Sequence, residues 1–237
     1  MSELMQLSAN ELKFLVKRSV EGVGFTPGDQ LSAGIKAAAA FQLGLANSQL
    51  LNLALDHLNN DVKAPKLTSS SDEELVFDAQ GQSALVQVEL ALGLGLAQCA
   101  PQVRINNVVA AVLAVPCLMS WLAQPLSQPQ AQQCYAVYFS HHSGAQRCVL
   151  IAADGQPLGL YQPLQKVVGA NELLVCMGQA DIDGVMITDG ADLLGWRERC
   201  LDQGVFLDAS LVARLKQMMH ASLVPETEAS RLGAGPG

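Results

Sequence analysis

The sequence is poor in basic side chains, and they form no cluster. The 237 residues include 14 lysines and arginines against 22 aspartates and glutamates, which gives a formal net charge of -8. Proteins that bind nucleic acid neutralise its phosphates with grouped lysines and arginines, and anionic membrane surfaces attract the same groups. We therefore expect neither nucleic acid nor a membrane among the partners of this chain.

Long apolar runs are absent as well. The most apolar stretch, Val108 to Ala123, has 16 residues and is interrupted by Pro116 and Ser120. A membrane-spanning helix needs about 20 predominantly apolar residues. The first residues also lack the basic start, apolar middle and cleavage site of a signal peptide. These features predict a cytoplasmic protein.

No pair of cysteines has the C-x-x-C spacing. Disulfide-stapled secreted domains are shorter than this chain and denser in cysteine. The sequence therefore predicts reduced, largely buried thiols, and neither a disulfide framework nor a metal site. The six residues concerned are Cys99, Cys117, Cys134, Cys148, Cys176 and Cys200.

Apolar residues make up half of the sequence and charged residues only 15%. This is ample material for a packed core and argues against disorder. We expect a single α+β domain over residues 1–237. Its parts are a helical subregion at 1–58, a linker at 59–72, a sheet-rich core at 73–190, and a helical end with a Gly-rich tail at 191–237.

Local signals place helices at both ends of the chain. Ser8 and Glu11 form a capping box, and Thr26 with Pro27 marks the start of a second helix. A third helix is expected over 48–58. Near the C-terminus, helices are predicted over 191–200 and over 209–220, the latter capped by Asp208.

The middle of the chain changes to a period of two residues, which predicts strands. The stretch 108–123 between them reads as one buried helix. Grouped strands between helical ends favour an α+β fold with a central mixed or antiparallel sheet. The predicted strands are 75–78, 85–92, 134–140, 147–153, 173–177 and 185–188, with 134–140 and 147–153 forming a hairpin.

Three motifs resemble functional sites but are better explained as structure. Gly93 and Gly95 lack the third glycine of a dinucleotide loop, which favours a kink in a strand. His141 and His142 lie in the predicted hairpin turn, where a solvated turn is the simpler interpretation than a metal site. The aspartates between 181 and 192 fit turns better than a calcium loop.

Arg104 stands in an apolar strand context. A buried guanidinium needs an anion, either a protein carboxylate or a ligand. The sequence favours an internal ion pair and leaves a ligand-binding role as the second interpretation.

The C-terminal segment has a composition that packing does not explain. An arginine followed by spaced glycines can grip an anion with its guanidinium and backbone N–H groups. The alternative is that Arg231 and Glu228 pin the segment to the domain surface. The candidate ligand-binding residues are Glu228, Ser230, Arg231, Gly233 and Gly235.

Two stretches resemble a bacterial family that is a domain of unknown function of about this length. They are the Ser-x-Asn-Glu helix start at 8–11 and the Val-Pro-x-x-Glu-Ala-Ser-Arg-x-Gly-Ala-Gly segment that ends at Gly235. The resemblance covers about a quarter of the chain and implies no activity.

A second resemblance is to the malate/L-lactate dehydrogenase family that lacks the usual Rossmann fold. The helices over 11–58 and the pattern over 197–218 are similar to that family. Its Ser-His-Gly motif carries a histidine that transfers a proton to the substrate. The corresponding region here reads Ala46-Asn47-Ser48-Gln49, without a histidine.

These observations lead to two functional hypotheses. The first is a non-enzymatic metabolic accessory protein that binds a small anionic metabolite. The alternative is a distant nicotinamide-dependent oxidoreductase related to the malate/L-lactate dehydrogenases but lacking their Ser-His-Gly motif. The absent motif favours the first. The sequence assigns no cofactor and leaves a homo-oligomer open.

Overall fold

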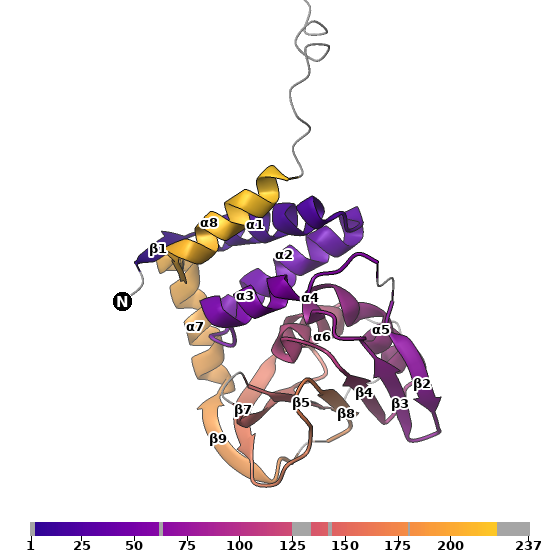
Figure 1. Ribbon diagram of the computed structural model, residues 1–237. Helices are drawn as coiled ribbons and strands as arrows, with labels where there is room; N and C mark the ends of the chain where they lie inside the picture. The colour runs from indigo at the N-terminus through magenta and orange to yellow at the C-terminus, as the bar shows by residue number, and fades with distance from the viewer. Residues whose placement is uncertain (1–2, 62–63, 125–133, 142–143, 180, 222–237) are drawn as a thin grey trace, which may run out of the picture.

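The computed structural model describes residues 3–61, 64–124, 134–141, 144–179 and 181–221. Within them, helices pack on a central sheet that mixes parallel and antiparallel pairs (Figure 1). The predicted α+β class with a mixed central sheet is therefore confirmed.

The first helices and the last one form a layer above the sheet (Figure 1). α1 and α2 pack on each other, and α8 packs on α1. The two predicted caps are confirmed, since Ser8 and Glu11 form the capping box and Thr26 accepts a hydrogen bond from the backbone N–H of Asp29. The helices of this layer are α1 (Ala9–Val23), α2 (Pro27–Gln42), α3 (Ser48–Asp56) and α8 (Ala209–His220).

The central sheet has the strand order β2-β3-β4-β8-β5-β6-β7-β9. Only the β3–β4 pair is parallel among the pairs of this sheet, and the predicted hairpin is the antiparallel β5–β6 pair. The strands are β2 (Lys66–Ser70), β3 (Glu74–Asp78), β4 (Gln102–Asn106), β5 (Tyr135–Ser140), β6 (Gln146–Ile151), β7 (Pro157–Pro163), β8 (Leu173–Met177) and β9 (Gly184–Asp189).

Four short helical segments lie between the upper helices and the sheet (Figure 1). The expected strand over 85–92 is wrong, because this stretch forms α4 and the start of α5. The buried residues of this stretch include Leu85, Val86 and Val88, so neighbouring elements cover it on several sides. Its sequence therefore lacks the single apolar face that identifies an amphipathic helix. The segments are α4 (Ala84–Gln87), α5 (Glu89–Ala97), η1 (Ala111–Leu113) and α6 (Ala114–Leu122).

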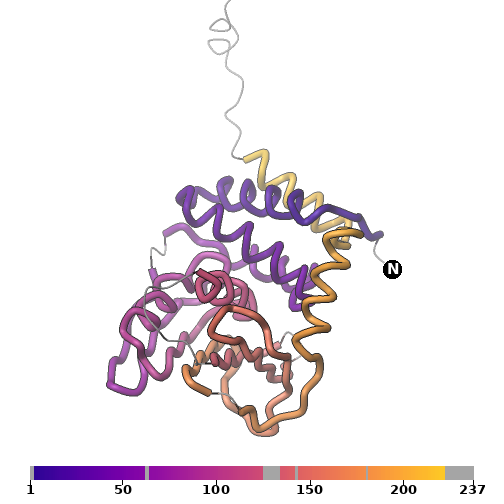
Figure 2. The backbone as a smooth tube through the Cα atoms, turned by 180° about the vertical axis from the view of Figure 1, so that it is seen from behind, coloured from indigo at the N-terminus to yellow at the C-terminus, as the bar shows by residue number. Residues whose placement is uncertain are grey.

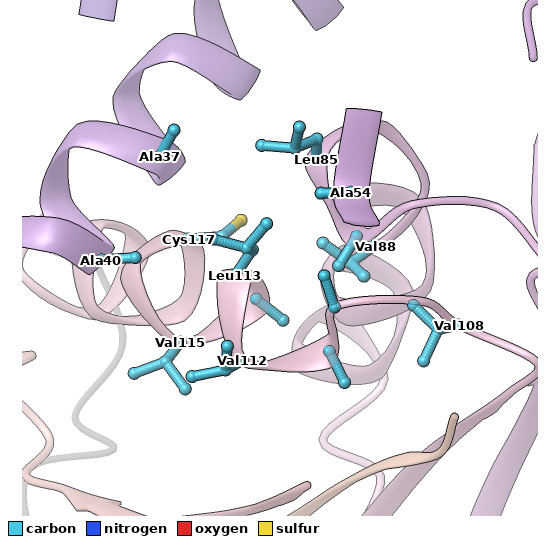
Figure 3. Packing of buried hydrophobic residues seen from close by; sticks show 14 of the residues in the cluster. Ala37, Ala40, Ala54, Leu85, Val88, Val108, Val112, Leu113, Val115 and Cys117 are labelled. Atoms are coloured by element: carbon cyan, nitrogen blue, oxygen red, sulfur yellow. The ribbon is translucent and has the colours of Figure 1, made fainter. Parts of the chain in front are cut away.

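The predicted buried helix is present as η1 and α6. Figure 3 shows its side chains Leu113 and Cys117 pointing toward Ala37 of α2 in the middle of the core. The alanines of α2 allow close approach of the two elements because they have short side chains. This buried apolar cluster includes residues from Leu12 to Leu215.

The expected linker at 59–72 is partly wrong, because it contains β2, which pairs with β3. The helix predicted over 191–200 is confirmed and is a few residues longer than expected. α7 (Gly190–Gln203) runs from the sheet back to the helical layer (Figures 1 and 2). It leads into β10 (Val205–Asp208), which pairs with β1 (Leu4–Leu7). The sequence did not predict either of these two strands.

The structure contains no disulfide among the six cysteines, all of which lie in its described part. Burial is less complete than expected: Cys117, Cys148 and Cys176 are buried, Cys134 and Cys200 are partly exposed, and Cys99 is exposed. In the part of the chain that the structure describes, every helix is too short or too polar to cross a bilayer.

Candidate active site

Two adjoining cavities lie at the end of the β5–β6 hairpin. We call them the His141 cavity, of about 240 Å³, and the Lys166 cavity, of about 430 Å³. Ser140, Gly144 and Ala170 line both. The shared lining makes them neighbouring parts of one cleft.

The His141 cavity has an apolar wall and a polar wall. The apolar wall comes from α3 and from the segment that enters η1. The polar wall comes from the end of β5 and the segment before β8. The apolar residues are Leu50, Leu53, Val108, Ala110 and Ala111, and the polar ones are Ser140, His141, Asn171 and Glu172.

The strand register brings the polar residues together. Phe139 of β5 lies opposite Leu173 of β8 in an antiparallel pair. The residues that follow Phe139 therefore meet the residues that precede Leu173, which places His141 and Glu172 at the same edge of the sheet. The turn holds His141 by two backbone hydrogen bonds of 2.8 Å, in which His141 N–H donates to the Ala145 carbonyl and its own carbonyl accepts from Gly144.

Glu172 is anchored from two sides. Its carboxylate accepts a hydrogen bond from the backbone N–H of Gly169, and its Oε2 lies 3.8 Å from Nη1 of Arg104. Arg104 in turn donates from Nε to Oε1 of Glu74 at 2.9 Å. The guanidinium of Arg104, whose side chain is a quarter exposed, therefore bridges two protein carboxylates. This is the internal ion pair that the sequence favoured, and it connects Arg104 to the cavity through Glu172.

The backbone around the cavity is unusual. Ala110 and Asn171, which both line it, have φ values of 57° and 56°. Alanine in the left-handed region costs about 1–2 kcal/mol. The segments are held together by a 2.9 Å hydrogen bond from Val108 N–H to the Asn171 carbonyl. Backbone strain of this kind concentrates at functional sites, where the surrounding structure imposes it.

The chemistry of the His141 cavity suits proton transfer. Histidine is the side chain that most often serves as general acid or base, because an imidazole changes its charge near neutral pH. Here it shares a small, half-apolar cavity with a carboxylate, a carboxamide and a hydroxyl group. Such a set can take a proton from a hydroxyl group or return one to a carbonyl oxygen.

The Lys166 cavity is lined by amides and one ammonium group, with no carboxylate among its lining residues. Gln146 is committed to the fold, because its Oε1 accepts from the N–H of Val167 and of Val168. Gln165 and Lys166 offer donors to the cavity. Donors of this chemistry fit phosphate and ribose hydroxyl groups, so the residues present are compatible with part of a nicotinamide dinucleotide.

Two other motifs of the sequence can be compared with the structure: the glycine pair and the candidate metal ligands. Gly93 and Gly95 lie inside α5, so the predicted strand kink is wrong. A Cβ on Gly95 would lie 2.1 Å from Cγ2 of Val103, and the glycine is therefore a contact between helix and sheet. Among the described residues, no three His, Cys, Asp or Glu side chains are grouped in a way that could hold a metal ion.

Of the site residues predicted from the sequence, the structure describes only Arg104. The other five candidates lie outside the described residues; they are Glu228, Ser230, Arg231, Gly233 and Gly235. Arg104 has the ion pairs given above. The sequence interpretation missed the grouping of His141 with Asn171 and Glu172, because only the β5–β8 register reveals it.

Comparison with solved structures identifies the class of fold. A dehydrogenase from Sinorhizobium meliloti is 13% identical, with a TM-score of 0.60 over 92% of this chain and 100% of that chain. A protein from E. coli assigned as a malate/lactate dehydrogenase is 10% identical, with a TM-score of 0.61 over 96% and 98% of the two chains. Malate dehydrogenase from Pyrococcus horikoshii OT3 is 10% identical, with a TM-score of 0.60 over 96% and 99%.

By sequence, no protein-family model and no curated protein matches the chain. The resemblance to a family of unknown function is therefore not confirmed. The resemblance to malate/L-lactate dehydrogenases agrees with the fold. The expectation of a non-enzymatic accessory protein is wrong, because the three solved structures given above, which share the fold, are dehydrogenases.

Proposed function

We propose that this chain is an oxidoreductase that interconverts a small 2-hydroxy acid and the corresponding 2-oxo acid with a nicotinamide cofactor. The observation that carries the proposal is the likeness to malate and lactate dehydrogenases over more than nine-tenths of the chain. The substrate is accordingly a small anionic metabolite, and the protein is cytoplasmic.

His141 acts as the acid and base of the proposed reaction. It removes the hydroxyl proton when the 2-hydroxy acid is oxidised, and it returns a proton to the carbonyl oxygen in the reverse direction. Glu172 faces the same cavity and balances the positive charge of the imidazolium that forms, while Arg104 holds Glu172 in place. When bound, the nicotinamide supplies or accepts the hydride.

The position of the missing histidine supports this assignment. The segment Ala46-Asn47-Ser48-Gln49, which stands where the resembling enzymes have Ser-His-Gly, leads directly into α3. Leu50 and Leu53 of α3 line the His141 cavity. His141 therefore lines a cavity whose wall includes α3, the helix that begins in the segment without a histidine.

Steady-state assays with NADH or NADPH and a panel of 2-oxo acids, including pyruvate and oxaloacetate, test the proposal. We expect consumption of the reduced nicotinamide with at least one acid. His141→Gln should lower kcat/KM by about 10²–10⁴, the usual contribution of a general acid–base. His220→Gln, at the end of α8, is the matched control and should keep full activity.

A thermal-shift measurement separates binding from catalysis. A nicotinamide at 100 times its dissociation constant should stabilise the protein by about 2.7 kcal/mol. The His141→Gln variant should retain this shift, because the imidazole handles the proton and not the dinucleotide. No turnover with any acid, together with no shift by NADH or NADPH, would refute the proposed function.

A further inference from the structure

A third cavity lies where the helical layer meets α6, α7 and the turn between β6 and β7. It has a volume of about 360 Å³ and is bordered by α1, α2, α6, α7 and the turn between β6 and β7. We call it the Lys13 cavity. We propose that it binds a small organic carboxylate with an apolar body, at a site separate from the proposed active site.

The charge of the cavity is the first argument. Lys13 of α1 and Arg197 of α7 line it, and no aspartate or glutamate is among its lining residues. No ion pair joins either cation to a carboxylate in the described part of the chain. In a protein with a net charge of -8, two cations facing one cavity without a carboxylate make a local site for an anion.

The rest of the lining defines the body of the ligand. The two alanines of α2 in the lining, Ala38 and Ala39, leave room in the cavity, and residues of α6 line another part of its wall. The apolar lining residues are Ile35, Ala38, Ala39, Leu43, Pro116, Met119 and Ala123, and the uncharged polar ones are Asn10, Gln42, Ser120 and Gln156. Cavities of about 300–1,000 Å³ that are mainly apolar, with a few polar groups, are typical ligand sites.

Gly155 closes the floor of the cavity. It has a φ of 81°, and a Cβ there would lie 2.2 Å from the backbone oxygen of Met119. Only glycine lets the β6–β7 turn approach α6 this closely. The turn therefore brings Gln156 against the end of α6, next to the apolar lining.

The Lys13 cavity is distinct from the cleft with His141. The cleft lies at the start of β6 and the Lys13 cavity at its end. β6 has six residues, and at a rise of about 3.3 Å per residue its first and last Cα atoms are about 17 Å apart. A carboxylate in the Lys13 cavity is thus too far away to be the reacting substrate.

Arginine and lysine together match a carboxylate head. A guanidinium binds both carboxylate oxygens through two parallel hydrogen bonds, and an ammonium group adds a point charge. The apolar lining from α2 and α6 accommodates an aromatic or short aliphatic body. Such a ligand contacts α1, α2, α6 and α7 at once and should stabilise their arrangement.

Isothermal titration calorimetry with benzoate, benzamide and inorganic phosphate tests the proposal. Benzamide has the same shape as benzoate without the charge, and phosphate has charge without an apolar body. We expect benzoate to bind more tightly than either. The double variant Lys13→Gln/Arg197→Gln should weaken benzoate binding about 10–100-fold, as expected for lost hydrogen bonds to a charged group.

Two further variants locate the site. Lys216→Gln/Arg199→Gln removes the same two charges from outside the cavity and should leave benzoate binding unchanged. Ser120→Trp, at an exposed position of α6, keeps both cations but fills the cavity and should abolish binding.

Equal benzoate affinity in the cavity and control double variants would overturn the proposal, and so would equal binding of benzoate and benzamide. Phosphate that binds as tightly as benzoate would also overturn it, because the apolar body would then contribute nothing. Nicotinamide turnover is measured separately, so failure here leaves the proposed activity standing, and the reverse also holds.

Discussion

The ion pair between Lys36 and Glu89 provides a quantitative test of how the core is built. Lys36 is on α2 with only 1% of its side chain exposed, and Glu89 starts α5 with 27% exposed. The carboxylate accepts hydrogen bonds from Lys36 Nζ and from the hydroxyl of Ser32. The pair thus joins the upper helical layer to the helices beneath it.

The two ends of this pair should respond differently to mutation. Glu89→Gln removes the charge that compensates a fully buried ammonium group, which typically costs about 3–5 kcal/mol. Lys36→Met leaves a carboxylate that is partly exposed and still bonded to Ser32, so we expect a smaller loss of about 1–3 kcal/mol. Replacing both residues with methionine should cost less than Glu89→Gln alone, since no buried charge then remains.

The pH dependence gives a second readout. Burial raises the pKa of Glu89, but the charge of Lys36 and the hydrogen bonds from Lys36 and Ser32 together lower it below its usual value of 4.5. A carboxyl group with a lowered pKa in the folded state stabilises the protein above its unfolded-state pKa. This stabilisation is lost as the pH falls below about 4.5 and through the folded-state value.

Urea unfolding at several pH values measures both effects. The wild type should lose stability on acidification more steeply than Lys36→Met, because the variant lacks the cation that favours the charged carboxylate. Equal m-values in all variants would show that the unfolded state is unchanged. A larger loss in Lys36→Met than in Glu89→Gln, or parallel pH profiles, would refute the reasoning.

Four other predictions concern the rest of the fold. Gly22→Ala places a Cβ 2.1 Å from a backbone oxygen of α8 and should cost about 1–3 kcal/mol in urea unfolding, and an unchanged midpoint would argue against close α1–α8 packing. Burial raises the pKa of Cys117 and Cys148 to about 12, so mass spectrometry should find both far slower to alkylate than the exposed Cys99 in native protein. Limited proteolysis within 59–72 should not release two stable fragments, whose recovery would instead indicate two domains. Arg231→Ala should weaken anion binding by about 2 kcal/mol with little change in stability, and equal affinity would exclude the C-terminal anion site.

The sequence by itself determined the features that depend on near neighbours in the chain. The helix starts at Ser8 and Thr26 were predictable because a capping side chain bonds backbone groups only two or three residues away. The β5–β6 hairpin was predictable because its strands adjoin and its turn is short. The α+β class followed from the same local patterns taken in order along the chain.

Tertiary structure decided what depends on residues far apart. The stretch 85–92 alternates like a strand but is helical. Because it is buried on several sides, it lacks the apolar periodicity that distinguishes a helix from a strand. β1 and β10 form a sheet only because two segments about 200 residues apart in the chain meet in the fold. The candidate active site depends on the register between β5 and β8, which brings His141 to Glu172. No local pattern encodes that register, since it results from the packing of the whole sheet.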